Sequence, residues 1–306
     1  MRLLVTYDGS PASASVFRPA ERLARRFGGD IVLLRIDDPR GKAENQDAAY
    51  FNELEADWQR ELDEIAASMA CPARAEVRRL FEQVWVTDAI LDAAVGIQAD
   101  LLVMATRGEN ELRHAFIGST ALGVMARSHI PLVLVRSGSE VPVEQRAKSE
   151  GPPRLLVTYD GSPSSRAALA PAAEIAVAGG GEIVLVWIHQ PIHLEVALEP
   201  DQQKREREIA KIESHMAAEL ESLGASLPCP YRAIVRPLTN ARWSVVDEIR
   251  TIAAEVDADL ICMATRGHSG FHHLLFGSTA LEMVGRSELP VMLVPAAPPI
   301  DTTPAD

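Results

Sequence analysis

Residues 2–11 read RLLVTYDGSP, and the same ten residues return at 154–163. Other stretches repeat in the same order: LLVMATRG at 101–108 as LICMATRG at 260–267, GSTAL at 118–122 as GSTAL at 277–281, and IPLVLV at 130–135 as LPVMLV at 289–294. The offset grows only from 152 residues (2 against 154) to 159 (101 against 260). A repeat on this scale indicates one duplicated domain of about 150 residues rather than a short-period solenoid.

The segment between the copies is rich in Gly, Pro, Ser and charges and has no hydrophobic periodicity, which is typical of a linker. We therefore expect a first domain over 1–137, a linker over 138–153 and a second domain over 154–297.

Each copy alternates short apolar runs with helical patterns. Continuous apolar strands are expected where both faces of a parallel sheet are covered, and strand–helix alternation predicts right-handed βαβ units. The sequence thus predicts an α/β protein of two doubly wound, five-stranded parallel-sheet domains. Strands are expected at 2–7, 31–36, 75–81, 101–105 and 131–135, and again at 154–159, 183–188, 231–236, 260–264 and 291–294. Helices are expected at 12–27, 43–69, 84–97 and 118–128.

Composition narrows the functional classes. The 306 residues are 47% hydrophobic, enough for ordinary cores, and carry a net charge of −13, which opposes binding to a nucleic-acid backbone. No apolar run approaches the roughly 18 residues of a membrane span, and the first apolar run is too short for a signal peptide. Three cysteines without a CxxC or Cys/His pattern indicate neither disulfides nor zinc. We expect a cytoplasmic protein.

Polar residues follow the first strand of each copy: Asp8-Gly9-Ser10 and Asp160-Gly161-Ser162. Ligands of such sheets bind beyond the carboxyl ends of the strands. A carboxylate at that edge can accept hydrogen bonds from sugar hydroxyls or a base amine, but Asp or Ser before a helix also caps its first turn. Both interpretations stay open at these residues.

A second polar stretch follows the fourth strand. Gly108 is followed, after nine residues, by Gly118, Ser119 and Thr120; the second copy has Gly267 and then Gly277, Ser278 and Thr279. Glycine lets the backbone approach a phosphate, and amides at a helix N-terminus bind anions. Because the spacing recurs twice after the same strand, it favours an anion site over a plain loop.

These residues resemble the universal stress protein family, whose nucleotide signature is G-x2-G-x9-G-[ST] with an Asp after the first strand. The resemblance covers nearly the whole chain as two domains. It implies a Rossmann-like fold of the adenine nucleotide alpha hydrolase type, paired through the fifth strands about a pseudo-two-fold axis, and ATP as ligand, with or without Mg²⁺. The implied nucleotide-binding residues are Asp8, Ile36, Gly108, Gly118, Ser119, Thr120, Asp160, Ile188, Gly267, Gly277, Ser278 and Thr279.

The first glycine of the signature is replaced by Ala105 in one copy and Ala264 in the other. The sequence therefore predicts an ATP-binding stress-response protein that acts through conformation or through an unidentified protein partner. Two alternatives remain: an interaction module of the same fold that binds no nucleotide, and a slow ATP hydrolase. No catalytic residues are predicted, because the loop lacks the lysine of a P-loop. A homodimer of tandem chains also stays open.

Three further features bear on the site. The nine-residue loop of the first copy carries Glu109 and Glu111, whereas that of the second carries three histidines and no acid, which predicts tighter phosphate binding in the second. Those histidines (His268, His272, His273) come without carboxylate or cysteine partners, so no metal site is predicted. Trp85 and Trp243 are expected in the core.

Overall fold

The computed structural model describes residues 1–39, 48–80, 84–106, 117–137, 151–189, 201–238, 244–265 and 276–295. The elements of the first half are β1 (Arg2–Thr6), α1 (Pro11–Ala14), α2 (Phe17–Phe27), β2 (Asp30–Asp37), α3 (Ala48–Ser68), β3 (Ala73–Arg79), α4 (Val86–Gly96), β4 (Leu101–Ala105), α5 (Ser119–Arg127) and β5 (Leu132–Val135). Those of the second half are β6 (Arg154–Thr158), η1 (Ser165–Ala168), α7 (Leu169–Gly179), β7 (Glu182–His189), α9 (Gln202–Ala225), β8 (Tyr231–Pro237), α10 (Val245–Glu255), β9 (Leu260–Ala264), α11 (Ser278–Arg286) and β10 (Val291–Val294).

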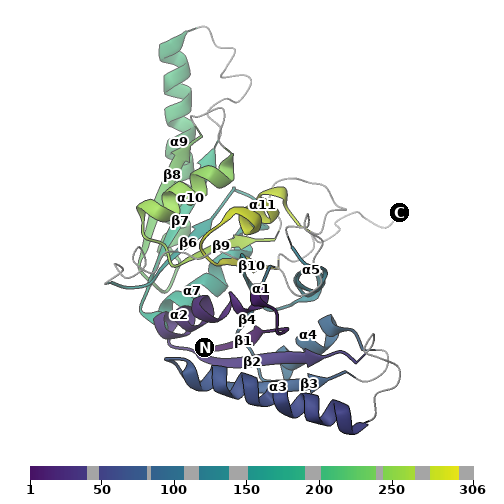
Figure 1. The fold of residues 1–306 in the computed structure, drawn as a ribbon. Helices are drawn as coiled ribbons and strands as arrows, with labels where there is room; N and C mark the ends of the chain where they lie inside the picture. The colour runs from purple at the N-terminus through teal and green to yellow at the C-terminus, as the bar shows by residue number, and fades with distance from the viewer. Residues whose placement is uncertain are drawn as a thin grey trace, which may run out of the picture.

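All ten strands form one sheet, in the order β3-β2-β1-β4-β5-β10-β9-β6-β7-β8 (Figure 1). Neighbours within each half run parallel, and the halves join where β5 meets β10 antiparallel, with Val133 opposite Met292. The predicted fold class and the predicted pairing of the fifth strands are both confirmed. Each half thereby covers a sheet edge that would otherwise expose unpaired backbone groups.

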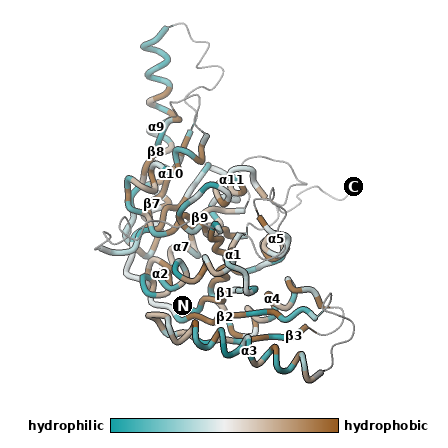
Figure 2. The backbone as a smooth tube through the Cα atoms, in the orientation of Figure 1, coloured by the Kyte–Doolittle hydropathy of each residue, from teal (hydrophilic) through white to brown (hydrophobic). Residues whose placement is uncertain are grey.

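Helices cover both faces of this sheet, so the strands are buried on both sides. One core lies beneath α2, α3, α7 and α9, and includes Phe27, Leu62 and Leu220. The other lies beneath α4, α5, α10 and α11. The hydropathy of the chain follows this arrangement, since the central strands are hydrophobic and the outer helix α9 is largely hydrophilic towards its free end (Figure 2).

The helix expected at 12–27 is in fact two helices, α1 and α2, and its counterpart divides into η1 and α7. The breaks have a common cause. A proline two positions into the second piece, Pro19 or Pro171, lacks an N–H and its ring clashes with the carbonyl four residues earlier. The third strand also differs from expectation: it covers Ala73–Arg79 instead of 75–81.

A buried ionic contact links the halves away from β5 and β10. Arg22 and Arg26 of α2 each contact a carboxylate oxygen of Asp259, just before β9, at 2.6 and 2.9 Å. The Asp259 side chain is only 2% exposed and also accepts a hydrogen bond from the backbone N–H of Arg154 at 3.0 Å. One carboxylate therefore fixes α2 of the first half against the second half.

Most of the expected linker, residues 138–150, lies outside the described residues; 151–153 have no regular structure. Among the described helices, none combines the length and the apolar character needed to span a bilayer.

Candidate functional site

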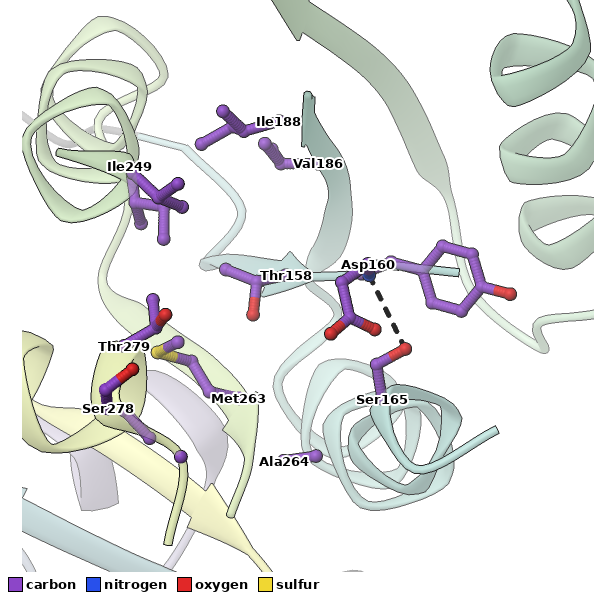
Figure 3. A pocket seen from close by; sticks show the side chains of 14 residues that line it. Thr158, Asp160, Ser165, Val186, Ile188, Ile249, Met263, Ala264, Ser278 and Thr279 are labelled. Atoms are coloured by element: carbon purple, nitrogen blue, oxygen red, sulfur yellow. Dashed lines mark hydrogen bonds between the residues drawn. The ribbon is translucent and has the colours of Figure 1, made fainter. Parts of the chain in front are cut away.

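A cavity of about 270 Å³ opens in the second half at the carboxyl ends of β6, β7 and β9 (Figure 3). This is the edge at which doubly wound sheets bind their ligands. Its lining combines apolar and polar side chains with the start of α11. The lining residues are Thr158, Tyr159, Asp160, Ser165, Val186, Ile188, Val245, Ile249, Met263, Ala264, Gly277, Ser278, Thr279 and Ala280.

The apolar part of the lining comes from alternate residues of β7 and from one face of α10. Val186 and Ile188 project towards Ile249, while Ser278 and Thr279 lie on another side, with Thr158 and Asp160 between (Figure 3). An apolar slot flanked by a few placed polar groups is the usual composition of a small-molecule site. A flat apolar ring fits the slot, with its polar substituents towards Asp160.

Asp160 follows β6 directly and organises the turn that leads to η1. Its Oδ1 accepts a hydrogen bond from the N–H of Ser162 at 2.9 Å, and its own N–H donates to Ser165 Oγ at 3.5 Å (Figure 3). Asp8 makes the same backbone contact with Ser10 at 2.9 Å and also accepts from Ser13 Oγ. Both interpretations of this residue hold together, because the carboxylate shapes the turn and the second copy lines the cavity.

The turn requires glycine at the next position. Gly9 and Gly161 have φ of 91° and 83°, a region that other residues rarely adopt. Space is also restricted there: a Cβ on Gly161 would lie 2.7 Å from the Trp187 ring, and one on Gly9 would lie 2.5 Å from the Arg35 guanidinium. The two halves therefore support the same turn with different side chains.

The N-terminus of α11 provides the anion-binding part of the site. The first helical hydrogen bond runs from Leu281 N–H to Gly277 C=O at 3.1 Å, and no side chain caps the helix. The amides of Ser278, Thr279 and Ala280 thus precede the ladder, beside two hydroxyls that line the cavity. Such a helix end attracts negative charge. Gly277 itself donates to Thr265 C=O at 2.8 Å, which ties the helix start to the end of β9.

The equivalent positions of the first half carry nearly the same residues. Counterparts follow from the elements, which match in length at offsets of 152 for β1 and β2 and 159 for α4, β4 and α5. The lining differs at one position only, Leu34 in place of Val186. The counterparts are Thr6, Tyr7, Asp8, Ser13, Leu34, Ile36, Val86, Ile90, Met104, Ala105, Gly118, Ser119, Thr120 and Ala121.

The sequence-predicted residues divide into three groups. Asp160, Ile188, Gly277, Ser278 and Thr279 lie together around the cavity. Asp8, Ile36, Gly118, Ser119 and Thr120 occupy the matching positions of the first half. Gly108 and Gly267, like the loops with Glu109 and His268, lie outside the described residues.

Sequence reasoning missed several lining residues because they belong to strands and helices rather than to loops. Thr158, Val186, Val245, Ile249 and Met263 carry no motif of their own. A usable signal was present in the repeat, since four of these five recur unchanged in the other copy whereas residues on the opposite faces of the same strands differ.

Ala264 lines the cavity floor where the family signature has glycine. Its methyl group borders the space without closing it, because about 270 Å³ remains open. Ala105 is buried to the same extent in the first half.

The expectation that Trp85 lies in the core is wrong, since its side area is 68% exposed. Trp85 is the residue before α4, and the matching residue before α10 is Ser244, one position beyond Trp243. The two tryptophans are thus one residue out of register. Trp243 lies outside the described part of the chain.

A tyrosine precedes each site aspartate and lies on the opposite face of the sheet. Burial, together with a hydrogen bond from its hydroxyl to Glu61, raises the pKa of Tyr7 to about 12. Burial and a hydrogen bond to Glu219 likewise raise the pKa of Tyr159. Both phenols stay neutral at physiological pH and connect the long helices to the site turn.

The fold and this site define an α/β protein of two similar halves, each with a small-molecule cavity position at the carboxyl edge of its strands. The model of the universal stress protein family matches residues 1–136 and 153–295. The chain belongs to that family, with two such domains in tandem.

Individual relatives agree with this assignment. A protein of Thermus aquaticus, described as a universal stress protein in QAH/OAS sulfhydrylase 3'region, is 30% identical over 135 residues, which are 44% of this chain and 97% of that protein. Among solved structures, a universal stress protein of Archaeoglobus fulgidus is similar over 97% of this chain and 96% of its own, with a TM-score of 0.62 and 19% identity. A functionally unknown protein of Pseudomonas aeruginosa PAO1 matches with a TM-score of 0.54 and 14% identity, over 96% and 92%.

Proposed function

We propose that this stress-response protein binds an adenine nucleotide, ATP, in each half and acts through conformation or partner binding rather than catalysis. The observation that carries the proposal is the cavity of the second half, whose lining recurs in the first half with a single change. Its three parts match the three parts of a nucleotide.

The apolar slot between β7 and α10 suits the base, which is flat and largely apolar. Asp160 and Thr158 suit the ribose hydroxyls, because a carboxylate and a hydroxyl accept hydrogen bonds from them. The start of α11 suits the phosphates, since it offers amides and hydroxyls to an anion. Mg²⁺ would accompany the triphosphate and needs no dedicated protein ligands.

The protein's ordinary solution behaviour tests the proposal directly. Purified protein is denatured, and the released small molecules are identified by ultraviolet absorbance and mass spectrometry. Titration calorimetry with ATP then measures affinity and stoichiometry. ATP that co-purifies, or that binds to two sites, supports the proposal. Absence of both favours an interaction module without nucleotide, and steady release of ADP or AMP favours a hydrolase.

Substitution at the helix starts connects binding to this site. Gly118→Asp with Gly277→Asp places two carboxylates where phosphates approach, and we expect ATP affinity to fall at least tenfold to a hundredfold, about 2 kcal/mol. Circular dichroism checks the fold, and Gly96→Asp at the far end of α4 is the matched control. ATP binding that survives in the folded double variant would contradict the proposed site.

We also propose that the protein acts in the cytoplasm, where ATP is abundant. Fractionation of cells that produce the full chain measures this, and recovery in another compartment would contradict it.

A further inference from the structure

The ten-stranded sheet ends in β3 on one side and in β8 on the other, at opposite extremes of the molecule (Figure 1). In each edge strand, alternate residues bond to the inner neighbour. Ile31 N–H donates to Pro72 C=O and Leu80 N–H to Asp37 C=O in the first half; Ile183 N–H donates to Pro230 C=O and Leu238 N–H to His189 C=O in the second. The odd-numbered residues of both strands therefore direct their backbone groups outwards.

The β3 edge is closed by a side chain of α3. The amide group of Gln59 donates to Ala75 C=O at 3.3 Å and accepts from Val77 N–H at 3.1 Å. A primary amide has the donor and acceptor of a peptide group, so Gln59 occupies the place that a neighbouring strand would take. Side-chain cover of this kind prevents edge-to-edge association.

The β8 edge lacks this cover. Matching contacts align the long helices, because Glu61 and Glu219 both accept from the tyrosine hydroxyls and Leu62 and Leu220 are both fully buried. On this alignment Ala217 of α9 stands where Gln59 stands in α3.

A methyl group offers neither donor nor acceptor. Within the described parts of the chain, no group hydrogen-bonds to Ala233 C=O or Val235 N–H, the counterparts of the two groups that Gln59 covers.

We propose that a second copy of this chain pairs with β8 through its own β8, antiparallel, to make one sheet across a dimer. The outward groups of Tyr231, Ala233 and Val235 would bond to those of the partner. The edge is bounded by Pro230 and Pro237, which have no N–H to contribute. The pairing is therefore short.

The arginines of β8 select the register. Arg232 and Arg236 lie on one face of the strand, where they pair with Glu182 and Glu255. Pairing centred on Arg232 or on Ile234 would set arginine directly opposite arginine, which is destabilising. Pairing centred on Ala233 sets Arg232 opposite the partner's Ile234 and Tyr231 opposite the partner's Val235, an aromatic and β-branched pair of the favourable kind.

Closure of the assembly follows from the difference between the edges. A sheet with two open edges would grow into a filament, whereas one covered and one open edge produce a two-fold dimer and stop. The exchange of Gln59 for Ala217 thus determines both that the chain associates and that it associates only once.

Analytical ultracentrifugation of the full chain from about 1 to about 100 µM tests the proposal, since a short interface implies micromolar affinity. We expect a concentration-dependent shift from the 33.2 kDa chain mass to twice that value. Ala217→Gln, which installs the first-half cover, should keep the chain monomeric. Ala218→Gln, at the exposed neighbouring position, is the matched control and should still dimerise. Gln59→Ala should open the second edge and produce species larger than dimers.

Hydrogen exchange locates the contact without any substitution. The amides of Ala233 and Val235 should exchange more slowly at dimer-forming concentrations, and those of Ala75 and Val77 should not change. The proposal is overturned by a wild-type chain that stays monomeric, by an Ala217→Gln chain that dimerises as well as wild type, or by a dimer that leaves the β8 amides unprotected.

Discussion

Asp259 is the residue whose substitution most directly tests how the halves are held together. Its carboxylate accepts from Arg22, Arg26 and the backbone N–H of Arg154, and water scarcely reaches it. The change Asp259→Asn keeps the size of the side chain but removes the charge. The two arginines then lose their common partner.

The expected cost follows from the contacts. A hydrogen bond to a charged group contributes about 1.5–3 kcal/mol, and a neutral one about 0.5–1.5 kcal/mol. Two charged bonds become neutral or are lost, so we expect a destabilisation of about 2–4 kcal/mol. The arginine side chains are about one quarter exposed, at 25% and 21%, and regain part of their hydration, which keeps the cost below that of leaving a buried charge unpaired.

The first half supplies the matched control. Asp100 precedes β4 as Asp259 precedes β9, and it too accepts a backbone N–H, from Arg2 at 2.6 Å. The positions of α7 that match Arg22 and Arg26 hold Glu174 and Ala178, which cannot form the same contact. We therefore expect Asp100→Asn to cost well under 1 kcal/mol in the same denaturant titration.

Unfolding in guanidinium chloride, followed by circular dichroism and by tryptophan fluorescence, measures both variants. A double-mutant cycle of Asp259→Asn with Arg22→Met should give a coupling of about 1–3 kcal/mol. Equal costs for Asp259→Asn and Asp100→Asn, or a coupling near zero, would refute the assignment of this carboxylate as the link between the halves.

Three further outcomes are expected. Because the acidic loop follows only the first anion site, Gly277→Asp should reduce total ATP binding more than Gly118→Asp in calorimetry, and equal losses would show that loop charge is unimportant. Tyr7 has a folded-state pKa of about 12 against an ordinary 10, so its contribution to stability is complete below pH 10 and is lost as pH rises to 12; Tyr7→Phe should flatten that alkaline loss in unfolding titrations, and an unchanged slope would contradict it. Limited proteolysis should cut within 138–153 and leave two folded pieces that co-elute through β5 and β10, whereas first cleavage within the described strands would contradict the domain boundary.

The repeat and the strand pattern were readable from the sequence because both are local. A parallel strand buried on two faces must be apolar throughout, so runs such as RLLVT and LLVMA identify themselves. Polar residues directly after such runs must lie at the carboxyl edge of the sheet. Asp160, Ser278 and Thr279 were predicted for that reason, and they meet around one cavity.

Side-chain exposure and helix continuity were less predictable. Trp85 follows an apolar residue and begins a helix, yet it faces outwards, since a residue just before a helix need not belong to the face that the helix buries. The break before α2 depends on Pro19, whose effect is local, but the apolar spacing around it still reads as one helix.

The sequence by itself determined the duplication, the alternation of strands and helices, and the identity of the polar residues at the strand ends, because each depends on neighbours along the chain. Only the tertiary structure decided that Val186, Ile249 and Met263 wall the cavity, that Asp259 meets two arginines more than two hundred residues away, and that Gln59 covers one sheet edge while Ala217 leaves the other open. These contacts join distant segments, and their geometry depends on how helices pack on the sheet, which no local pattern of residues encodes.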